Sequence, residues 1–568
     1  MKTTIEEIFQ VQGYSIPNYQ RDYAWKVENF RDLWEDLEEA IEYNKKGQGH
    51  FIGTMVVAKN NKKLYDIIDG QQRTTTIFML LHVLANEQNE KDKQETRKYL
   101  YQKGELKLEV APENQSFFKA LLEAVEKGNI SPCEKDADTE GKQNLFEVLK
   151  AILDEVSNLN KEEVNERLEA LLEMVLVRLE EPDPGRAIRT FQSVNDRGVP
   201  LLLLDKLKSL LIYYSNTFCN GERELDQFIN DHFGEIFKIF AKIKKSNHFS
   251  SVGGPDEGDI FRYHAGSQEF DGIEFLGHYE SSTENTYERL KDELKEIKKS
   301  KLKSFIRSYV SDLKNFYQAF LDLLSEIDTN KTTFKAMLIN TINPLFFNSL
   351  IRLKINNELD DETLKLFAKT DILLLKSGRE IRSKAYNLIY EYLQKGKEGL
   401  KSEMISQCRN YIDIELASLE FVKNAYNLKH PSYFHYVFFE KNCQEMDLAD
   451  LKKLIRDKQL SQDKERIIPE NLLKSDNEIE IQKLGFEDKK DLEDHINTYG
   501  NLISLEKSLN LKASDKDLYG KDEIYKSSEI PFNRRFNVKG FNKKALKKRN
   551  DEMREWLTNT FFKDFATH

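Results

Sequence analysis

The chain has 568 residues, more than a single hydrophobic core usually supports, so roughly three or four domains are expected. Its 86 basic and 97 acidic residues give a net charge of −11, which excludes a uniformly basic nucleic-acid coat but not a local basic patch. No apolar run is long enough to cross a membrane, and Glu6 and Glu7 stand where a signal peptide needs apolar residues. The four cysteines are too far apart for a disulfide framework or a zinc site. These features predict a cytoplasmic protein without a membrane partner.

The first part of the chain has the pattern of a mixed α/β region. Apolar residues at helical spacing predict a helix across residues 30–41, and two apolar runs at 51–58 and 64–68 predict strands. A helix over 71–84 follows the second strand. Residues 86–180 are mostly helical in pattern with a loop at 131–141, and a turn at 182–185 precedes helices at 186–194 and 204–214.

Helical periodicity dominates from 216 to about 400, with a break near Lys298–Lys301 and a loop-rich insertion at 248–277. Beyond 405, strand-like and turn-rich stretches alternate with helices, and basic residues concentrate at the end. The sequence therefore predicts an α+β multidomain protein that is mostly helical, with domains at 1–215, 216–404 and 405–568.

The segment DIIDGQQRTTT predicts a strand, a tight turn and a helix start. Gly70 allows a turn that a side chain would block, and Gln71, Gln72 and Arg73 then stand at a helix N-terminus, where free N–H groups and the helix dipole favour an anion. Asp69 adds a carboxylate for a cation or a water. This set suits a phosphate ester; the alternative is an Asp69–Arg73 pair that caps its own turn.

Three motifs in order carry a family resemblance: IPNYQRDYAW followed by HFIGTMVV, then DIIDGQQRTTT, then FQSVNDRGVPL with Asp205 and Lys208. Together they resemble the N-terminal module called domain of unknown function 262, a ParB/sulfiredoxin-like α/β domain of GmrSD-type restriction systems. The resemblance implies nucleotide binding and hydrolysis, with GTP or ATP as substrate. The catalytic residues it implies are Asp69, Gln71, Gln72 and Arg73, and the nucleotide-binding residues are Gln20, Arg21, Gly70, Asn195, Arg197 and Lys208.

Two of these assignments have structural alternatives. Lys208 stands three residues after Asp205 on one helix face, so the two side chains can simply pair. The segment Asn195–Gly198 also has the pattern of a helix C-terminal turn.

A second resemblance covers the C-terminal segments ERIIPEN, YGNLISL and SLN. They are similar to domain of unknown function 1524, an HNH-type nuclease of the ββα-metal class, which implies Mg²⁺ or Mn²⁺ as cofactor. Glu465 and Asn510 are the implied metal ligands, and Arg466, Asn501 and Lys521 complete the nuclease-like site, with Asn501 bracing the loop.

Arg466 stands where this nuclease family has its catalytic His. A general base must be partly neutral near pH 7, whereas a guanidinium stays protonated. The nuclease is therefore either inactive or takes its base from elsewhere, and His495 or a partner chain are the alternatives. Arg466 itself can still grip a phosphate.

The segment 533–549 is strongly basic and contains no acidic residue. A local reversal of charge in an acidic chain, interleaved with Phe532, Phe536 and Phe541, indicates contact with a phosphate backbone; the alternative is a solvated basic helix face. The expected DNA-binding residues are Arg534, Arg535, Lys543, Lys544, Lys547 and Lys548.

The combined expectation is a GmrSD-like antiphage or restriction protein. An N-terminal nucleoside triphosphatase controls a C-terminal DNA-binding, HNH-like endonuclease whose catalysis is impaired. Its expected partners are nucleotide and DNA, including modified phage DNA, and a second copy or another defence protein remains open. The alternative is a non-cleaving, nucleotide-regulated DNA-binding or protein-interaction regulator.

Overall fold

The computed structural model describes residues 2–11, 13–17, 20, 22–44, 50–59, 64–181, 203–219, 223–246, 255–267, 282–377, 388–456, 460, 464–474 and 478–566. The chain folds into two compact units. The first comprises Met1–Lys242 and Tyr287–Lys314, and the second comprises Ile243–Thr286 and Asn315–His568. Throughout the described ranges, no helix combines the length and the apolar character that a membrane span requires.

A six-stranded sheet forms the base of the first unit, in the order β1-β8-β3-β4-β2-β7. Its strands are β1 (Lys2–Thr4), β2 (Tyr14–Ser15), β3 (Phe51–Lys59), β4 (Tyr65–Asp69), β7 (Leu108–Glu109) and β8 (Val175–Glu181). β3 pairs antiparallel with β4 and parallel with β8, while β2 runs parallel to β4 and β7. The sheet is therefore mixed. The strands predicted at 51–58 and 64–68 are confirmed, whereas the sequence pattern missed β8.

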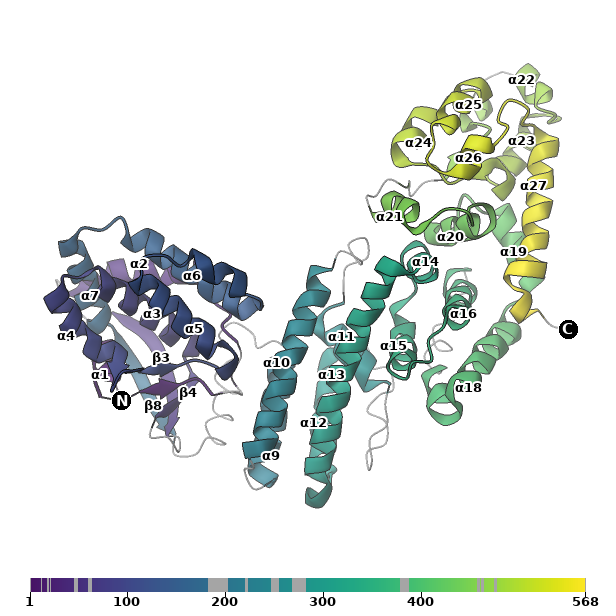
Figure 1. Ribbon diagram of the computed structural model, residues 1–568. Helices are drawn as coiled ribbons and strands as arrows, with labels where there is room; N and C mark the ends of the chain where they lie inside the picture. Colours follow the sequence, from purple (N-terminus) through teal and green to yellow (C-terminus); the bar gives the residue numbers. More distant parts are fainter. Residues whose placement is uncertain are drawn as a thin grey trace. The chain divides into compact units, whose positions relative to one another are not determined.

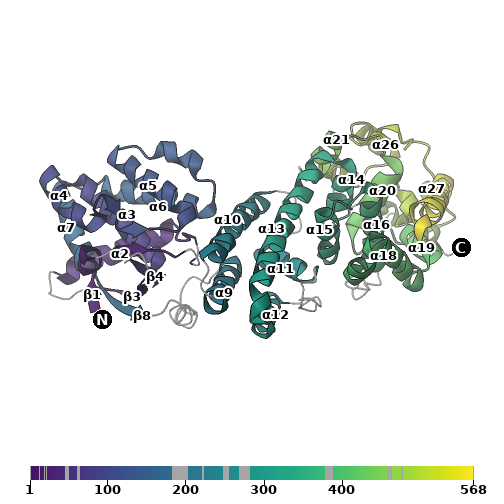
Figure 2. The same cartoon turned by 60° about the horizontal axis from the view of Figure 1, so that its bottom comes forward.

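Helices cover this sheet, as Figures 1 and 2 show with β1, β3 and β8 on one side and α3 to α7 on the other. The helices of this part are α1 (Ile5–Val11), α2 (Val27–Asn44), α3 (Gln71–Glu87), α4 (Glu90–Leu100), α5 (Pro112–Glu126), α6 (Glu140–Val156) and α7 (Lys161–Glu173), with a 3₁₀ turn at Ser131–Asp136 and a small β5–β6 hairpin (Tyr101–Gln102, Glu105–Leu106). Further along the chain the unit includes α9 (Leu203–Phe218), most of α10 (Arg223–Lys245) and α12 (Thr283–Glu296).

α3 is the central helix of the first unit, and most of its residues are buried. Its first turns nevertheless carry hydroxyls, and each one is satisfied locally. Thr74, Thr75 and Thr76 donate to the carbonyls of residues 70, 71 and 72 at 2.8, 2.8 and 2.9 Å. Because these three threonine hydroxyls all have partners, the polar start of the helix can be buried. From Ile77 onward the helix continues with apolar residues in the core.

The second unit is almost entirely helical among its described residues. It contains α11 (Glu257–Ala265), α14 (Lys331–Phe334), α15 (Phe347–Ile355), α16 (Asp361–Asp371), α18 (Leu388–Tyr411), α19 (Ile414–Lys423), α20 (Pro431–Asn442), α21 (Leu448–Arg456), α22 (Glu478–Lys483), α23 (Lys489–Ile496), α24 (Lys507–Ala513), α25 (Leu518–Lys526), α26 (Pro531–Arg535) and α27 (Lys543–Trp556). π-helical segments lie at Lys335–Ile339, Ile372–Lys376 and Leu557–Phe561, and 3₁₀ turns at Pro344–Phe346, Glu470–Leu473, Tyr499–Asn501 and Lys563–Phe565. The strands are β9 (Glu465–Arg466) and β10 (Leu502–Ile503), and α13 (Lys299–Thr329) has residues in both units.

Several predicted elements differ from the structure. The predicted loop at 131–141 contains the 3₁₀ turn and the start of α6, and the predicted insertion at 248–277 contains α11. Asp256 and Asp259 form a capping box at the start of α11, which stabilises a helix in a segment whose glycines favour a loop. The break near Lys298 is confirmed between α12 and α13. The turn and helix predicted at 182–194 lie outside the described residues.

The alternation of strands and helices predicted beyond residue 405 overestimates the strand content of the described residues. The described strands there have two residues each, with one isolated bridge between Leu460 and Glu506, and the remaining elements are helices and turns. Buried aromatic residues such as Tyr436, Phe438 and Phe439, a residue type that also suits strands, lie on the helix α20.

Candidate functional sites

The first candidate site lies where β4 ends and α3 begins. Gly70 joins them with φ 87°, in the left-handed region, and no side chain caps the helix. The Oδ1 atom of Asp69 accepts a 2.8 Å hydrogen bond from the backbone N–H of Gly70. A helix N-terminus without a side-chain cap leaves N–H groups available to an external acceptor. The strand, turn and helix predicted for this motif are confirmed.

Two glutamines join the IPNYQRDYAW segment to this turn. Gln20 donates from Nε2 to the carbonyl of Ile68 at 2.8 Å. Gln72 donates from Nε2 to the carbonyl of Asp22 at 3.0 Å, and its Oε1 accepts from the backbone N–H of Ala24 at 2.8 Å. Gln72 thus uses both ends of its amide to hold the segment. Arg21, expected beside Gln20, lies outside the described residues.

Arg73 is the least satisfied cation of the site. Its guanidinium makes no hydrogen bond or ion pair with any described residue, so the alternative Asp69–Arg73 pair is absent. Burial lowers the pKa of Arg73, and the more distant carboxylates of Asp69 and Asp36 only partly oppose this effect. A partly buried guanidinium without a protein partner is costly unless an anionic ligand completes it.

Two buried amide oxygens of the segments that meet at this turn also lack hydrogen bonds among the described residues. They are Oε1 of Gln20 and Oε1 of Gln71, whose side chains are 2% and 5% exposed. Buried polar atoms are normally paired, so a water or a polar ligand at this turn would supply their partners. The site combines an uncapped helix start with a guanidinium and two amide oxygens that have no hydrogen-bond partner among the described residues, and together these groups can hold a charged, polar ligand.

Lys208 lies in a charged cluster that the sequence only partly predicted. Its side chain is 1% exposed, and Nζ lies 3.6 Å from Oε1 of Glu113, so the ion pair that the structure gives Lys208 is with Glu113 rather than Asp205. Asp22 belongs to the same cluster: its carboxylate accepts from the backbone N–H of Tyr23 at 2.7 Å and from the side chain of Asn114.

Burial, with Glu113 close by, raises the pKa of Asp22 to about 6. Sequence analysis missed Asp22, Glu113 and Asn114 as neighbours of the site because they come from separate segments. The aspartate inside YQRDYAW was the one available signal. Asn195 and Arg197, expected to bind nucleotide, lie outside the described residues.

The second candidate site surrounds β9 in the second unit. β9 pairs antiparallel with β10, with Glu465 opposite Ile503, and α24 follows β10. Oε1 of Glu465 accepts hydrogen bonds from Nζ of Lys521 at 2.6 Å and from the hydroxyl of Tyr525 at 3.0 Å. Burial raises the pKa of Glu465 and lowers the pKa of Lys521, while their mutual attraction opposes both shifts. Glu465 and Lys521, named separately from the sequence, are thus in direct contact.

Arg466 is held on three sides. Its guanidinium lies 3.5 Å from the ring centroid of Tyr426, donates from Nε and Nη2 to Oδ1 of Asn497 at 3.1 and 3.0 Å, and pairs through Nη1 with Glu470 at 3.0 Å. Cation–π stacking and paired hydrogen bonds fix a planar guanidinium well. Arg466 is therefore an ordered part of the fold, not a loose side chain.

Asn501 braces the loop after β9. Its side chain is fully buried and accepts from the N–H of Ile468 at 2.8 Å, while Nδ2 donates to the carbonyls of Ile468 and Ile496 at 3.0 and 2.9 Å. His495, the alternative base, directs Nδ1 to the carbonyl of Asp491 in its own helix at 2.7 Å. One of its two ring nitrogens is therefore occupied by a contact within α23.

The oxygen ligands available for a divalent cation are few. No group of three or more His, Cys, Asp or Glu side chains in the described parts of the chain is arranged to hold a metal. Oε1 of Glu465 is occupied by Lys521 and Tyr525, and no described residue bonds Oε2. Asn510 lies on α24, which packs against α25, the helix of Lys521. Mg²⁺ or Mn²⁺ at this place would rest on Glu465 Oε2, Asn510 and water.

The basic segment at the end of the chain divides into buried and exposed cations. Arg549 is fastened inside: it donates to the carbonyls of Gly500 and Leu502 at 2.6 and 2.9 Å and lies 4.9 Å from the ring of Phe536. Arg534 donates to the carbonyl of Ser528 at 3.0 Å, and Arg535 pairs with Glu445. The interleaved phenylalanines therefore pack against one another and Arg549, instead of facing a ligand.

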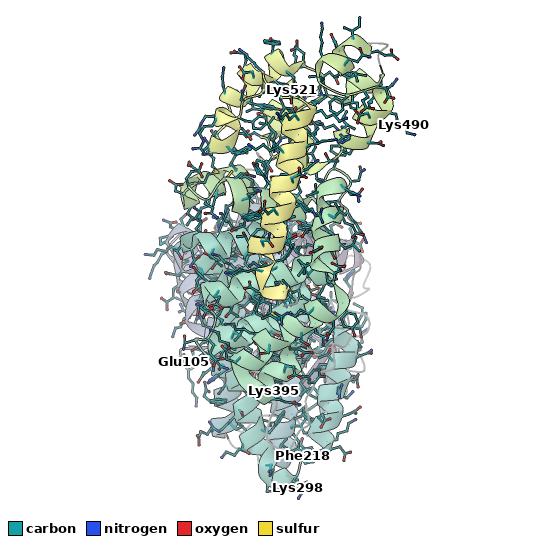
Figure 3. All side chains as sticks on the ribbon, turned by 90° about the vertical axis from the view of Figure 1, so that its right-hand side faces the viewer. Glu105, Phe218, Lys298, Lys395, Lys490 and Lys521 are labelled. Atoms are coloured by element: carbon teal, nitrogen blue, oxygen red, sulfur yellow. The ribbon has the colours of Figure 1, made fainter. Side chains whose placement is uncertain are left out.

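The exposed cations line a groove along α27, the yellow helix in Figure 3, which runs down the face of the second unit with Lys521 labelled near its upper end. Lys544 and Lys547 are exposed there and have no ion-pair partner among the described residues. Lys543 pairs with Asp491, and Lys548 lies 3.7 Å from Glu552. The lining residues are Lys483, Leu484, Gly485, Asn542, Lys543, Lys544, Lys547, Lys548, Asp551, Glu552 and Glu555. Lys483 was not foreseen from the sequence.

Comparison with known protein families gives two matches in the same order along the chain. Residues 5–212 match the model of the GmrSD restriction endonuclease N-terminal domain, and residues 411–556 match the model of the GmrSD restriction endonuclease C-terminal domain. Together the two matches cover more than half of the chain. A search of curated proteins found no match.

Proposed function

This chain belongs to the GmrSD-type restriction protein family, and we propose that its first unit binds and hydrolyses a nucleoside triphosphate to control a DNA-directed second unit. The protein would act in the cytoplasm against foreign DNA, including modified phage DNA. Nucleotide hydrolysis would take place at the start of α3, and DNA would lie along α27.

The observation that carries the nucleotide proposal is the guanidinium of Arg73 at the uncapped start of α3, which has no hydrogen bond or ion pair with any residue that the structure describes. A triphosphate carries several negative charges and many acceptor oxygens, which suits both the guanidinium and free helix N–H groups. Gln20 and Gln71 would orient neutral groups of the same ligand, and Asp69 would receive a cation or a water. ATP and GTP fit this chemistry equally well.

DNA contact in the second unit is supported by the family and by the groove along α27. Lys544 and Lys547 carry charges that no described acid neutralises, and phosphate neutralisation by such side chains supplies most sequence-independent affinity for DNA. Phosphates would enter from the side of the lysines, because Asp551, Glu552 and Glu555 repel them at the other end of the groove.

We propose that the endonuclease of this second unit is impaired. Arg466 cannot accept a proton from an attacking water near neutral pH, and its contacts with Tyr426, Asn497 and Glu470 leave it no freedom to move aside. A second copy of the chain or a partner defence protein would then have to supply the base.

A non-cleaving, nucleotide-regulated DNA-binding protein is the second candidate. One observation favours it: Lys521 already places a positive charge on Glu465, the carboxylate expected to ligate a metal. Under this alternative, nucleotide changes DNA retention while the DNA stays intact under every condition.

The test of the nucleotide site is release of inorganic phosphate from ATP and GTP by wild-type protein and by Arg73→Ala. Loss of a phosphate-binding cation typically lowers the rate by about 10²-fold or more. Arg97→Ala is a matched control, because Arg97 is an exposed arginine of the same unit that lies over Tyr101, and its rate should stay at the wild-type value. Wild-type protein that neither binds nor hydrolyses any triphosphate would contradict the proposal.

A further inference from the structure

Arg73 lies directly against Gly53 of β3. A Cβ atom added to Gly53 would lie 2.7 Å from Nη1, 3.1 Å from Cζ and 3.2 Å from Nη2 of Arg73. Three guanidinium atoms at such similar distances mean that the guanidinium lies flat across the Gly53 backbone. No other residue could stand at position 53 while Arg73 keeps this place, because even a methyl group would collide with it.

The backbone around Gly53 is adapted to this contact. Gly53 has φ +113°, a conformation that residues with side chains rarely adopt, and the register of β3 against β8 shifts between Phe51 and Thr54. Gly70 packs onto the same stretch, since a Cβ there would lie 3.3 Å from the carbonyl oxygen of Thr54. The turn before α3 is therefore seated on residues 53–55 of β3.

The guanidinium of Arg73 packs on Gly53 and has no hydrogen bond or ion pair with any described residue. We infer that Gly53 is a positioning residue, whose missing side chain forms the seat that aims the Arg73 guanidinium at an anion bound at the start of α3. The identity of that anion rests on the proposed function, whereas the seat itself rests on geometry alone. A preorganised cation needs no rearrangement when the ligand binds.

The test is a double-variant cycle of Gly53→Ala and Arg73→Ala. Both single variants should lower kcat/KM for triphosphate hydrolysis by about 10²-fold, and the double variant should be no worse than Arg73→Ala alone, because both changes remove the same interaction. Effects that multiply would overturn the inference, since Gly53 would then act by another route.

Thermal unfolding of the same variants separates a collision from backbone strain. Backbone strain at φ +113° should lower the melting temperature of Gly53→Ala with either residue at position 73, and the collision should add a further loss only when residue 73 is Arg. A Gly53→Ala variant that is equally destabilised, or fails to fold, with either residue at position 73 would refute the seat. Gly128→Ala is the matched control: Gly128 has φ +74° with nothing within 4 Å of an added Cβ, so it carries strain without collision and should leave kcat/KM within twofold of wild type.

The proposed nucleotide function and the positioning role of Gly53 can be refuted separately. Absence of hydrolysis by wild-type protein contradicts the proposed nucleotide function. The stability cycle still decides whether Gly53 seats Arg73, and binding of inorganic tripolyphosphate to wild type and Gly53→Ala, measured by calorimetry, decides whether the seat serves an anion. Equal tripolyphosphate affinity in the two proteins would overturn the inference.

Discussion

The ammonium of Lys521 donates a 2.6 Å hydrogen bond to Oε1 of Glu465, and the two side chains are 0% and 5% exposed. Lys521 also donates to the backbone carbonyl of Arg466. One cation thus joins α25 to β9 and holds the carboxylate and the arginine of the nuclease-like site in a fixed relation. The attraction offsets the cost of burying both charges only while both partners are present.

Removing one partner of this pair should destabilise the second unit strongly. Lys521→Met leaves Glu465 charged and buried, and such a change typically costs about 3 to 5 kcal/mol. Calorimetric melting should show the transition of the second unit at a lower temperature. Lys526→Met on the same helix is the control, because the side chain of Lys526 is 56% exposed and its partner Asp522 keeps a second cation, Lys539, at 3.3 Å. Its loss should cost only about 0 to 1 kcal/mol. Equal melting of the two variants would contradict a structural role for the buried pair.

Arg466→His should create or raise DNA nicking in the presence of Mg²⁺ or Mn²⁺. General-base catalysis typically contributes about 10²- to 10⁴-fold, and an imidazole can be neutral at pH 7 where a guanidinium cannot. Conversion of supercoiled plasmid to nicked circles measures the gain, and Asn510→Ala in the same background should remove it. Fast cutting by the wild-type protein with no change in Arg466→His would show that another residue or chain supplies the base.

Replacing Lys544, Lys547 and Lys548 with Glu should weaken DNA binding and flatten its salt dependence. If each lysine neutralises one phosphate, the log–log salt slope should fall by about 3. Lys543 is left in place because it pairs with Asp491, so its loss would confuse binding with folding. Lys298→Glu, Lys299→Glu and Lys301→Glu carry the same charge change on an exposed stretch of the first unit and should leave the slope unaltered. A slope that does not respond to the α27 changes would make this helix face an ordinary solvated surface.

Asp22 should give the first unit a characteristic pH dependence. Its pKa is raised from 3.8 to about 6, so between these values the folded state holds a proton that the unfolded chain has lost. The stabilisation from this group is fully present below about pH 4 and is lost as the pH rises through 6. Asp22→Asn, which cannot titrate, should therefore gain stability relative to wild type across this range, by on the order of 2 to 3 kcal/mol.

Melting temperatures of Asp22→Asn and wild type at a series of pH values from 4 to 7.5 would measure this difference. Asp138→Asn is the control, because the pKa of Asp138 is lowered by a hydrogen bond from Lys142. Its contribution is complete above the usual aspartate pKa and changes little from pH 4.5 upward. A stability difference for Asp22→Asn that stays flat from pH 4 to 7.5 would mean that its carboxylate is ionised throughout.

Local sequence signals predicted the strand, turn and helix that form the first candidate site. The apolar run before Asp69, the glycine at 70 and the apolar spacing after Thr76 define β4, the turn and α3 within one continuous stretch of chain. Each signal depends on neighbours in sequence, and hydrogen bonds between residues four apart complete the helix start. Only the structure shows that Arg73 has no hydrogen bond or ion pair among the described residues, because the sequence places Asp69 close enough to pair with it.

Contacts between distant segments were beyond the sequence patterns. The cluster of Asp22, Glu113 and Lys208 joins segments up to 186 residues apart in number, and periodicity shows which residues share a face but not what covers it. Arg549, the last residue of the basic segment, shows the same limit: a run of basic residues suggests solvent, yet its side chain packs on Phe536 and donates to two carbonyls. The capping pair Asp256 and Asp259 could have predicted α11.

We propose that nucleotide hydrolysis in the first unit controls how the second unit acts on DNA. The most direct test follows phosphate release and the state of the DNA in one reaction. Wild type and Arg73→Ala would each be incubated with ATP or GTP and with modified or unmodified DNA. Wild-type protein should release phosphate from at least one nucleotide, and this nucleotide should change the retention or integrity of DNA. Both effects should disappear in Arg73→Ala. Wild-type protein whose action on DNA is the same with and without every nucleotide, and the same in Arg73→Ala, would contradict the claim.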